Sequence, residues 1–305
     1  MTGPPNIFNR RLHRLRVARV EKSPDAADFL RRRVSEDLAE RLAAINRRFD
    51  LAVDLGSQGD GFAQALAASG AASKVGLLIE ARMATGRATR QIPSLVADEE
   101  RLPFADNAIG LFVSPLALHW VNDLVGALIQ IRRALRPDGL FIGAFFGGAT
   151  LTELRQSLMA AEIEVRGGAG PRVSPFVDAA DGAALLQRAG FALPVADTDV
   201  VSVRYDSPLK LLKDLRAMGE TSALIDRPTA PLTREILART LEIYRERHAA
   251  SDGRIPATFE ILTLTGWAPH PDQQKPLRPG SAKARLADAL NSPETLIGHS
   301  GTPPP

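Results

Sequence analysis

The stretch from residue 51 to residue 62, LAVDLGSQGDGF, decides the fold of this chain. An apolar strand ends at Asp54, a loop with Gly56, Gly59 and Gly61 follows it, and a helix-forming run comes next. Glycine lets a backbone approach a ligand closely, and the N-terminus of a helix presents N–H groups without partners inside the helix. This order of elements predicts a nucleotide-binding loop. The loop lacks G-x-G-x-x-G, so an NAD-dependent oxidoreductase is the weakest alternative.

Composition is that of an ordinary globular protein. The 305 residues are 45% apolar and 24% charged, enough for one large domain or two small ones. No apolar run reaches the roughly 18 residues that span a bilayer, and the N-terminus has no signal-peptide core. The chain has no cysteine, which excludes disulfides and cysteine nucleophiles and favours a cytoplasmic location.

Positive charge gathers near the two ends of the chain. The net charge is +3, and basic residues concentrate at 10–33 and 275–285. A basic end can contact nucleic acid or an acidic protein. No aromatic residues interleave with these arginines as base stacking requires, so a solvated helix face and a tail are favoured and no nucleic-acid partner is expected.

Short apolar strands alternate with helical patterns between residues 51 and 145. Right-handed strand–helix–strand units of this kind predict an α/β fold, a Rossmann-like doubly wound and mainly parallel sheet. The turn Arg136-Pro137-Asp138-Gly139 is expected to end the helix before the fifth strand. The expected strands are 51–55, 74–79, 94–97, 109–114 and 140–145, and the expected helices are 60–69 and 121–135.

The flanking segments suggest three parts. Residues 1–23 are expected to form a basic arm, and residues 24–269 the domain, beginning with a helix that Ser23 caps. Within the domain, a helical lid is expected over about 150–250, with helices at 150–165, 178–189, 207–219 and 231–249. An extended segment at 191–205 and a last strand at 258–267 complete it. Residues 270–305 are expected to form a basic, disordered tail.

Four features after the glycine loop fit a bound nucleoside. Glu80 closes the second strand, where Rossmann-type sites place an acid on the ribose hydroxyls, although a surface acid is as frequent there. Asp98 and Glu99 precede an apolar Leu-Pro-Phe, which suits the amine and face of an adenine ring. Ser114 ends the fourth strand, at the edge from which small polar groups reach a ligand. His119-Trp120 follows on the same rim, where a packed loop aromatic is an equal alternative.

Four segments carry a resemblance to a known family: DLGSQGDGF, VADEERLPFAD, VSPLALHWVNDLVGALIQIRRALRPDGLF and GGATLTELR. Together they resemble the class I S-adenosylmethionine (SAM) methyltransferases of type 11. The nearest groups are the malonyl carrier-protein methyltransferases of biotin synthesis and a mitochondrial complex I assembly factor linked to arginine hydroxylation. Through PRVSPFVDAADGAALLQRAGF, LLKDLRAMGET and QQKPLRPGSAKARLADAL the resemblance covers roughly residues 6–290.

The resemblance implies a set of cofactor-binding residues. It places the methionine end of SAM on the loop, the ribose on the strand-two acid, and the adenine on the acid pair. The loop departs from the family's G-x-G-x-G at Gln58, and Glu80 stands where aspartate is usual. The implied cofactor contacts are Asp54, Gly56, Ser57, Gly59, Gly61, Glu80, Asp98, Glu99 and Ser114.

The predicted function is SAM-dependent methyl transfer to an unidentified small-molecule or protein acceptor. The sequence identifies no catalytic residue, since it has no G-x-S-x-G elbow, and a carboxylate acceptor needs no base. Its five histidines lack metal-ligand spacing, so no metal site is predicted. The alternatives are a binding module for a respiratory complex I subunit and an arginine hydroxylase acting on that subunit. The candidate substrate contacts are His119, Trp120, Tyr205 and Arg172, the last of which suits a substrate carboxylate or an internal salt bridge.

Overall fold

A computed structural model of the chain describes residues 6–23, 27–56, 58–84, 92–228 and 230–273. The described residues up to His270 form one compact unit. Residues 274–305 of the expected tail lie outside the described part of the chain. Among the described residues, no helix is both long enough and apolar enough to cross a membrane.

The unit is built on a seven-stranded sheet whose order is β3-β2-β1-β4-β5-β7-β6. Strands β1 to β5 pair in parallel, whereas β7 is antiparallel to both β5 and β6. This arrangement confirms the predicted doubly wound, mainly parallel sheet. The strands are β1 (Phe49–Leu55), β2 (Val75–Arg82), β3 (Ser94–Val96), β4 (Ile109–Pro115), β5 (Leu135–Phe146), β6 (Ala192–Tyr205) and β7 (Ile255–Trp267).

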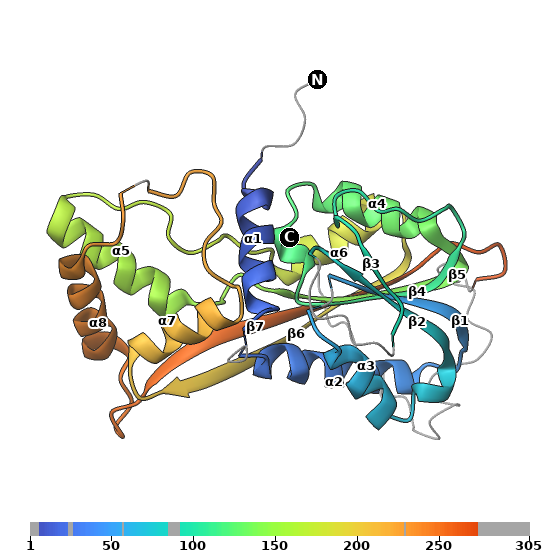
Figure 1. Ribbon diagram of the computed structural model, residues 1–305, viewed down its shortest axis with the longest axis horizontal. Helices are drawn as coiled ribbons and strands as arrows, with labels where there is room; N and C mark the ends of the chain where they lie inside the picture. Colours follow the sequence, from blue (N-terminus) through green and yellow to red (C-terminus); the bar gives the residue numbers. More distant parts are fainter. Residues whose placement is uncertain (1–5, 24–26, 57, 85–91, 229, 274–305) are drawn as a thin grey trace, which may run out of the picture. The chain divides into compact units, whose positions relative to one another are not determined.

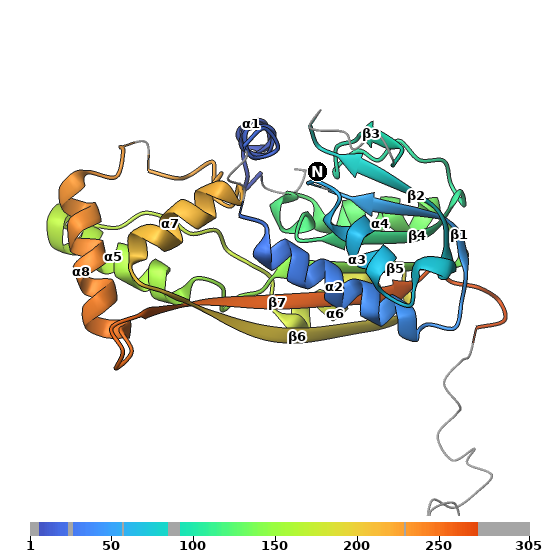
Figure 2. The ribbon, with the colours of Figure 1, turned by 60° about the horizontal axis from the view of Figure 1, so that its bottom comes forward.

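Helices cover both faces of the sheet (Figures 1 and 2). Helices α2 and α3 lie on one face and α4 and α6 on the other, while α5, α7 and α8 gather at the far end of the long β6–β7 pair. The helices are α1 (Arg10–Val20), α2 (Phe29–Ala44), α3 (Gly61–Ala68), α4 (Leu124–Ala134), α5 (Thr152–Arg166), α6 (Ala179–Arg188), α7 (Pro208–Ala217) and α8 (Arg234–His248). Two 3-10 turns, η1 (Ala72–Lys74) and η2 (Leu118–Trp120), complete the order.

Alternation along the central strands produces a hydrophobic core on each face. In β4, Leu111 and Val113 belong to the core beneath α2 and α3, whereas Phe112 belongs to the core beneath α4 and α6. In β5, Ile142 and Phe141 divide in the same way. Because successive side chains of a strand point to opposite faces, a parallel sheet with two covered faces reads as a nearly continuous apolar run.

Three elements differ from the sequence-based expectation. Residues 10–20 of the expected arm form helix α1, whose buried side chains His13, Val17 and Val20 recur at helical spacing. The next helix begins at Phe29 rather than at Ser23, and residues 24–26 lie outside the described part of the chain. The Arg-Pro-Asp-Gly turn lies within β5, where the pairing with β4 shifts register. Helix α4 still ends before that turn, as predicted.

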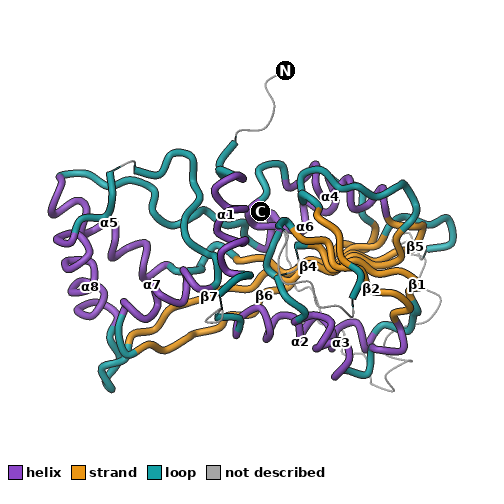
Figure 3. The backbone as a smooth tube through the Cα atoms, viewed as in Figure 1, coloured by secondary structure: helices purple, strands orange, loops and turns teal. Residues whose placement is uncertain are grey.

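The sheet places its ligand edge at the centre. The chain runs outward from β1 to β2 and β3, then returns to β4 on the other side, so the order reverses between β1 and β4. Ligands of doubly wound sheets bind at such a switch point, beyond the carboxyl ends of the strands. Figure 3 shows the central strands gathered on one side of α1, with the long β6–β7 pair extending from them to the α5, α7 and α8 group.

Candidate functional site

The glycine loop follows β1 directly and turns sharply. Asp54 is buried at the end of that strand, and the Gly56 N–H donates to the Ala81 carbonyl at 2.8 Å. Gly56 has φ +77°, and a Cβ there would lie 2.1 Å from the Ala117 Cβ. Gly59 has φ +88°, but a Cβ there would have nothing within 4 Å. Glycine is therefore required twice by backbone conformation, and at position 56 also by space.

The other residues of the loop differ in where they lie. Gly61 begins helix α3 behind the loop. Ser57 lies outside the described residues. Gln58 and Asp60 line a cavity with Gly59, so the residue that departs from the family pattern faces this space.

This space, the loop cavity, has a volume of about 420 Å³. Small-molecule sites commonly measure about 300–1,000 Å³. Its walls come from the glycine loop, α1 and its end, α2, the end of β2, the end of β5 and the residues after α7. Besides Gln58, Gly59 and Asp60, they include Val20, Glu21, Leu30, Arg31, Arg82, Leu116, Phe146, Met218 and Glu220.

Arg31 and Leu116 both line the loop cavity, and a hydrogen bond joins the Arg31 side chain to the Leu116 backbone. The Arg31 guanidinium donates to the carbonyls of Pro115 at 2.6 Å and Leu116 at 3.3 Å. Leu116 has φ +54°, a left-handed conformation that is unusual for leucine. Its N–H donates to Ala144, so β5 and α2 together hold this backbone in place. Strained residues held in this way cluster at binding sites.

Glu80, the expected ribose acid, lies fully buried at the end of β2. Its Oε2 accepts from Arg82 Nε at 3.0 Å, and Arg82 also lies 4.0 Å from Glu21. Its Oε1 has no hydrogen-bond donor among the described residues. Arg82 rather than Glu80 is the residue that lines the loop cavity.

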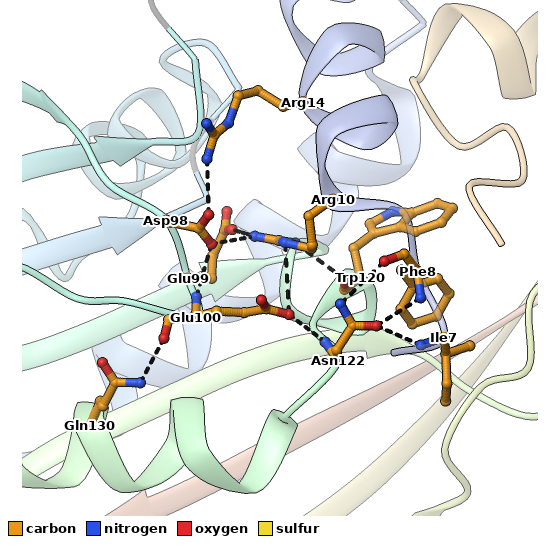
Figure 4. Close-up of polar contacts among 10 residues, drawn as sticks. All are labelled: Ile7, Phe8, Arg10, Arg14, Asp98, Glu99, Glu100, Trp120, Asn122 and Gln130. Carbon is orange, nitrogen blue, oxygen red and sulfur yellow. Dashed lines mark hydrogen bonds and ion pairs between the residues drawn. The ribbon is translucent and has the colours of Figure 1, made fainter. Parts of the chain in front are cut away.

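The expected adenine acids are bound by helix α1 (Figure 4). Arg10 Nη2 lies 2.8 Å from Asp98 Oδ1 and also contacts Glu99 Oε2. Arg14 Nη2 lies 2.9 Å from Asp98 Oδ2. Arg10 Nη1 further donates to the Trp120 carbonyl at 3.2 Å. The first turns of α1 are therefore tied to the loop that follows β3.

The pKa values of the two carboxyl groups are shifted in opposite directions. Burial acts to raise the pKa of Asp98, but hydrogen bonds from the Glu100 N–H and Arg10 outweigh it and lower the pKa. Burial raises the pKa of Glu99 despite the opposing charge of Arg10.

Ser114, the expected contact after the fourth strand, is hydrogen-bonded within the sheet, since its hydroxyl donates to the Leu55 carbonyl at 2.9 Å.

Two of the candidate substrate contacts meet on a third residue. His119 Nε2 lies 3.1 Å from Glu220 Oε2, and Trp120 Nε1 donates to the same oxygen at 3.0 Å. Sequence reasoning interpreted Glu220 only as the residue after a helix-ending glycine. The structure places it between two cavities, because it lines the loop cavity and also the one described next.

The second cavity, here the apolar cavity, has a volume of about 340 Å³ and shares Phe146 and Glu220 with the loop cavity. Its walls come from α5, α7, β7 and the loop before α6. Polar members include Arg16, Trp120, Arg172, Ser174, Glu220 and Arg227, and apolar members include Leu154, Leu158, Phe176, Leu215, Leu232 and Phe259.

Of the other two candidates, Arg172 is held in an ion pair and Tyr205 is buried in the core. Arg172 Nη2 lies 2.6 Å from Glu162 Oε1, which is the internal salt bridge weighed as an alternative. Tyr205 is buried in the core at the end of β6. Burial and the nearby Asp214 carboxylate raise the pKa of the Tyr205 hydroxyl.

Sequence reasoning missed Arg10, Arg31, Arg82 and Glu220. Arg31 is one of three consecutive arginines, and nothing local distinguishes it from Arg32 and Arg33. The helical spacing of His13 and Val17 was the one signal that α1 packs on the domain. The partners of these charges lie far along the chain, where local patterns carry no information.

Comparisons with known proteins agree with this architecture. Residues 53–143 match the methyltransferase domain family. The protein named arginine-hydroxylase NDUFAF5, mitochondrial, from Danio rerio is 39% identical over 287 residues, covering 93% of this chain and 89% of the relative. Its Homo sapiens counterpart is 41% identical over 291 residues, covering 93% and 83%. The malonyl-[acyl-carrier protein] O-methyltransferase of Halorhodospira halophila is 33% identical over 272 residues, covering 87% and 90%.

Solved structures share the fold at low sequence identity. A Bacillus halodurans protein has a TM-score of 0.52 at 15% identity, covering 77% of this chain and 99% of that chain. The YcgJ protein of Bacillus subtilis has a TM-score of 0.50 at 14% identity, covering 77% and 98%. The near-full-length relatives carry the assignment further than these structures do. The chain belongs to the enzyme family with a methyltransferase domain that includes the NDUFAF5 arginine hydroxylases and the malonyl carrier-protein methyltransferases.

Proposed function

We propose that this enzyme transfers the methyl group of SAM to an acceptor bound in the apolar cavity. The observation that carries the proposal is that the loop cavity and the apolar cavity share Phe146 and Glu220. When bound, the sulfonium of SAM supplies an electrophilic methyl group. Methyl transfer is an in-line displacement, so the chain contributes mainly the proximity and orientation of two bound molecules. Two adjoining cavities provide that arrangement.

The methionine end of SAM fits the loop cavity. Gly56 packs directly against Ala117 and so holds the start of the loop, while Gly59 lines the cavity and a Cβ there would meet nothing within 4 Å. Arg31 lines the same cavity and offers a guanidinium to the methionine carboxylate. We assign these residues to the methionine end.

For the nucleoside end of SAM, the described residues offer a contact to the ribose but none to the adenine. The Glu80 Oε1 is buried without a donor, and a ribose hydroxyl would supply one. Asp98 and Glu99 are paired with Arg10, and neither lines the loop cavity. We therefore assign Glu80 to the ribose and leave the adenine contacts unassigned.

Calorimetry tests the cofactor half of the proposal. SAM and S-adenosylhomocysteine are expected to bind the full-length protein with one site each. Absence of binding at millimolar ligand would overturn the proposed methyl transfer. The acceptor half is tested by incubating the enzyme with isotopically labelled SAM and cell extract, and locating the label by mass spectrometry.

Arginine hydroxylation on a complex I subunit is the second candidate. Relatives 39–41% identical over 93% of this chain are named arginine hydroxylases, and this observation favours it. Mass spectrometry of the subunit from a deletion strain distinguishes the chemistries, since an arginine would lack one oxygen rather than one methyl group. A purely structural assembly role predicts that deletion lowers assembled complex I while Asp54→Ala leaves assembly unaffected.

A further inference from the structure

Glu220 stands where the two cavities meet. It follows Gly219, whose φ of +83° ends helix α7 and turns the chain toward η2. The Glu220 side chain is only 8% exposed, yet it lines both the loop cavity and the apolar cavity. Burying a carboxylate without a hydrogen-bonding or charged partner costs free energy, so Glu220 is expected to have partners.

One oxygen of this carboxylate is held by two donors. Trp120 Nε1 donates to Oε2 at 3.0 Å, and His119 Nε2 lies 3.1 Å from the same oxygen. The His119 Nδ1 is buried and has no partner among the described residues. A bare ring nitrogen there costs less than an unpaired N–H, so the tautomer with the proton on Nε2 is favoured and His119 also donates.

The other oxygen has no partner in the described chain. No hydrogen bond joins Glu220 Oε1 to a described residue, and this atom is not among the fully buried unpaired ones. The nearby cation Arg31 attracts Glu220 at longer range, but its guanidinium donates to Pro115 and Leu116. Two donors thus orient the carboxylate and leave Oε1 available to the cavities.

Charge is distributed unevenly around the apolar cavity. Glu220 is shared with the loop cavity, whereas Arg16, Arg172 and Arg227 line the apolar cavity and not the loop cavity. Arg172 is paired with Glu162, and Arg16 and Arg227 donate to the backbone carbonyls of the segment after Glu220. Glu220 is therefore the one carboxylate among the described lining residues of the apolar cavity, and it lies where this cavity meets the loop cavity.

We propose that Glu220 makes the apolar cavity selective for an acceptor whose nucleophile is the hydrogen-bond-donating nitrogen of an amine on an apolar body. This inference rests on the proposed function. A carboxylate nucleophile at the same point would face the Glu220 carboxylate across a poorly solvated gap, and like charges there repel. A nitrogen donor would supply the partner that Oε1 lacks.

The transfer step balances with this assignment. The acceptor nitrogen forms a bond to the methyl carbon while the sulfur–methyl bond breaks and sulfur keeps the electron pair. The proton that the nitrogen loses passes to Glu220 Oε1, and S-adenosylhomocysteine is the other product. Glu220 thereby binds the acceptor and takes up its proton.

A matched pair of small probes tests the selectivity. Benzylamine and phenylacetate carry the same aromatic ring and methylene but opposite charges. The chain has two tryptophans, so Trp267→Phe leaves Trp120, the Glu220 partner, as the sole tryptophan, which is excited selectively over tyrosine. In this background, with S-adenosylhomocysteine present, benzylamine is expected to change the emission saturably at concentrations at least tenfold lower than phenylacetate does.

The variant Glu220→Gln keeps the shape of the side chain and removes its charge. Its affinity for benzylamine is expected to fall tenfold or more, while that for phenylacetate stays level or rises. Glu36→Gln, at an exposed position of α2, is the matched control and keeps the preference. Equal or tighter binding of phenylacetate, saturation by neither probe, or an unchanged preference in Glu220→Gln would each overturn the inference.

Calorimetry with S-adenosylhomocysteine separates this failure from failure of the proposed function. If both the parent protein and Glu220→Gln bind it and the probe preference is absent, the inference fails and methyl transfer stands. If neither binds it, the proposed function fails, and the probe titrations without cofactor still decide what Glu220 selects.

Discussion

Arg10 of helix α1 lies against Asp98, with Nη2 2.8 Å from Oδ1, although 88 residues separate them in sequence. The same guanidinium contacts Glu99 and the Trp120 carbonyl. One side chain thus joins the N-terminal helix, the loop after β3 and the turn after β4. The N-terminal helix is therefore part of the site's architecture rather than a free arm.

Replacing Arg10 by methionine is expected to lower the free energy of unfolding by about 3 kcal/mol, because one partner of a buried ion pair is left uncompensated. The Glu99 side chain is 3% exposed and the Arg10 side chain 12%. Urea unfolding measures the change. Arg14→Met is the control, since its half-exposed pair with Asp98 is worth at most about 1 kcal/mol. Equal losses in the two variants would contradict the central role of Arg10.

The two loop glycines separate steric exclusion from backbone strain. Both have positive φ, which costs an L-residue about 1–2 kcal/mol. Gly56→Ala also meets Ala117, so it is expected to destabilise by more than that amount and to abolish S-adenosylhomocysteine binding. Gly59→Ala meets nothing and should show the strain alone with measurable binding retained. Thermal unfolding and calorimetry measure both quantities, and equal behaviour of the two variants would refute the close approach at Gly56.

Arg31 is expected to bind the carboxylate of the methionine moiety. Arg31→Met should weaken S-adenosylhomocysteine at least tenfold, or about 1.4 kcal/mol. It should leave 5′-methylthioadenosine, which lacks that carboxylate, within about threefold of the parent affinity. Arg31→Lys, which keeps the charge, should recover part of the loss. Parallel loss of both ligands would mean that Arg31 acts only by holding Pro115 and Leu116.

Stability should depend on pH through Glu162. Burial acts to raise the pKa of Glu162, but hydrogen bonds from Arg172 and the Gly170 N–H, with the charges of Arg172 and Arg166, lower it overall. The unfolded chain, with a glutamate pKa of about 4.3, then binds more protons than the folded chain in acid. The stabilisation is present above pH of about 4.3 and is lost as the pH falls through the lower folded pKa.

Urea midpoints measured across this acid range test the prediction. The wild-type midpoint should fall with pH, and Glu162→Gln should reduce both the midpoint at neutral pH and its slope in acid. Glu36→Gln, at an exposed site, should reproduce the wild-type slope. An unchanged slope in Glu162→Gln would assign the acid dependence to other carboxylates.

Local patterns predicted most of the secondary structure. The apolar runs around Val53 and Phe112 specify buried strands, and α4, α7 and α8 follow from helical spacing between turn signals. Helix α1 was not recognised, since its arginines outnumber the buried His13, Val17 and Val20. Its packing depends on partners in the segments after β3, β4 and α7, which no window of the sequence around α1 contains.

The residues of the candidate site also divide into those that the local sequence predicted and those that it did not. The glycine loop, the buried acid Glu80 and the rim residues His119 and Trp120 have local signatures at strand ends, and the structure gathers them at the switch point. The sequence could not predict which side chains pair with these carboxylates. Arg82 takes one oxygen of Glu80, and Arg10 takes the acids after β3.

The sequence by itself determined the strand–loop–helix order, the doubly wound sheet and the family, because alternation, turn residues and motifs are properties of neighbouring positions. Only the tertiary structure decided which charges meet. It joined His119 and Trp120 to Glu220 across about a hundred residues and set that carboxylate between two cavities. Electrostatic and hydrogen-bond energies depend on distance in space and on burial, and both are fixed by the packing of distant segments.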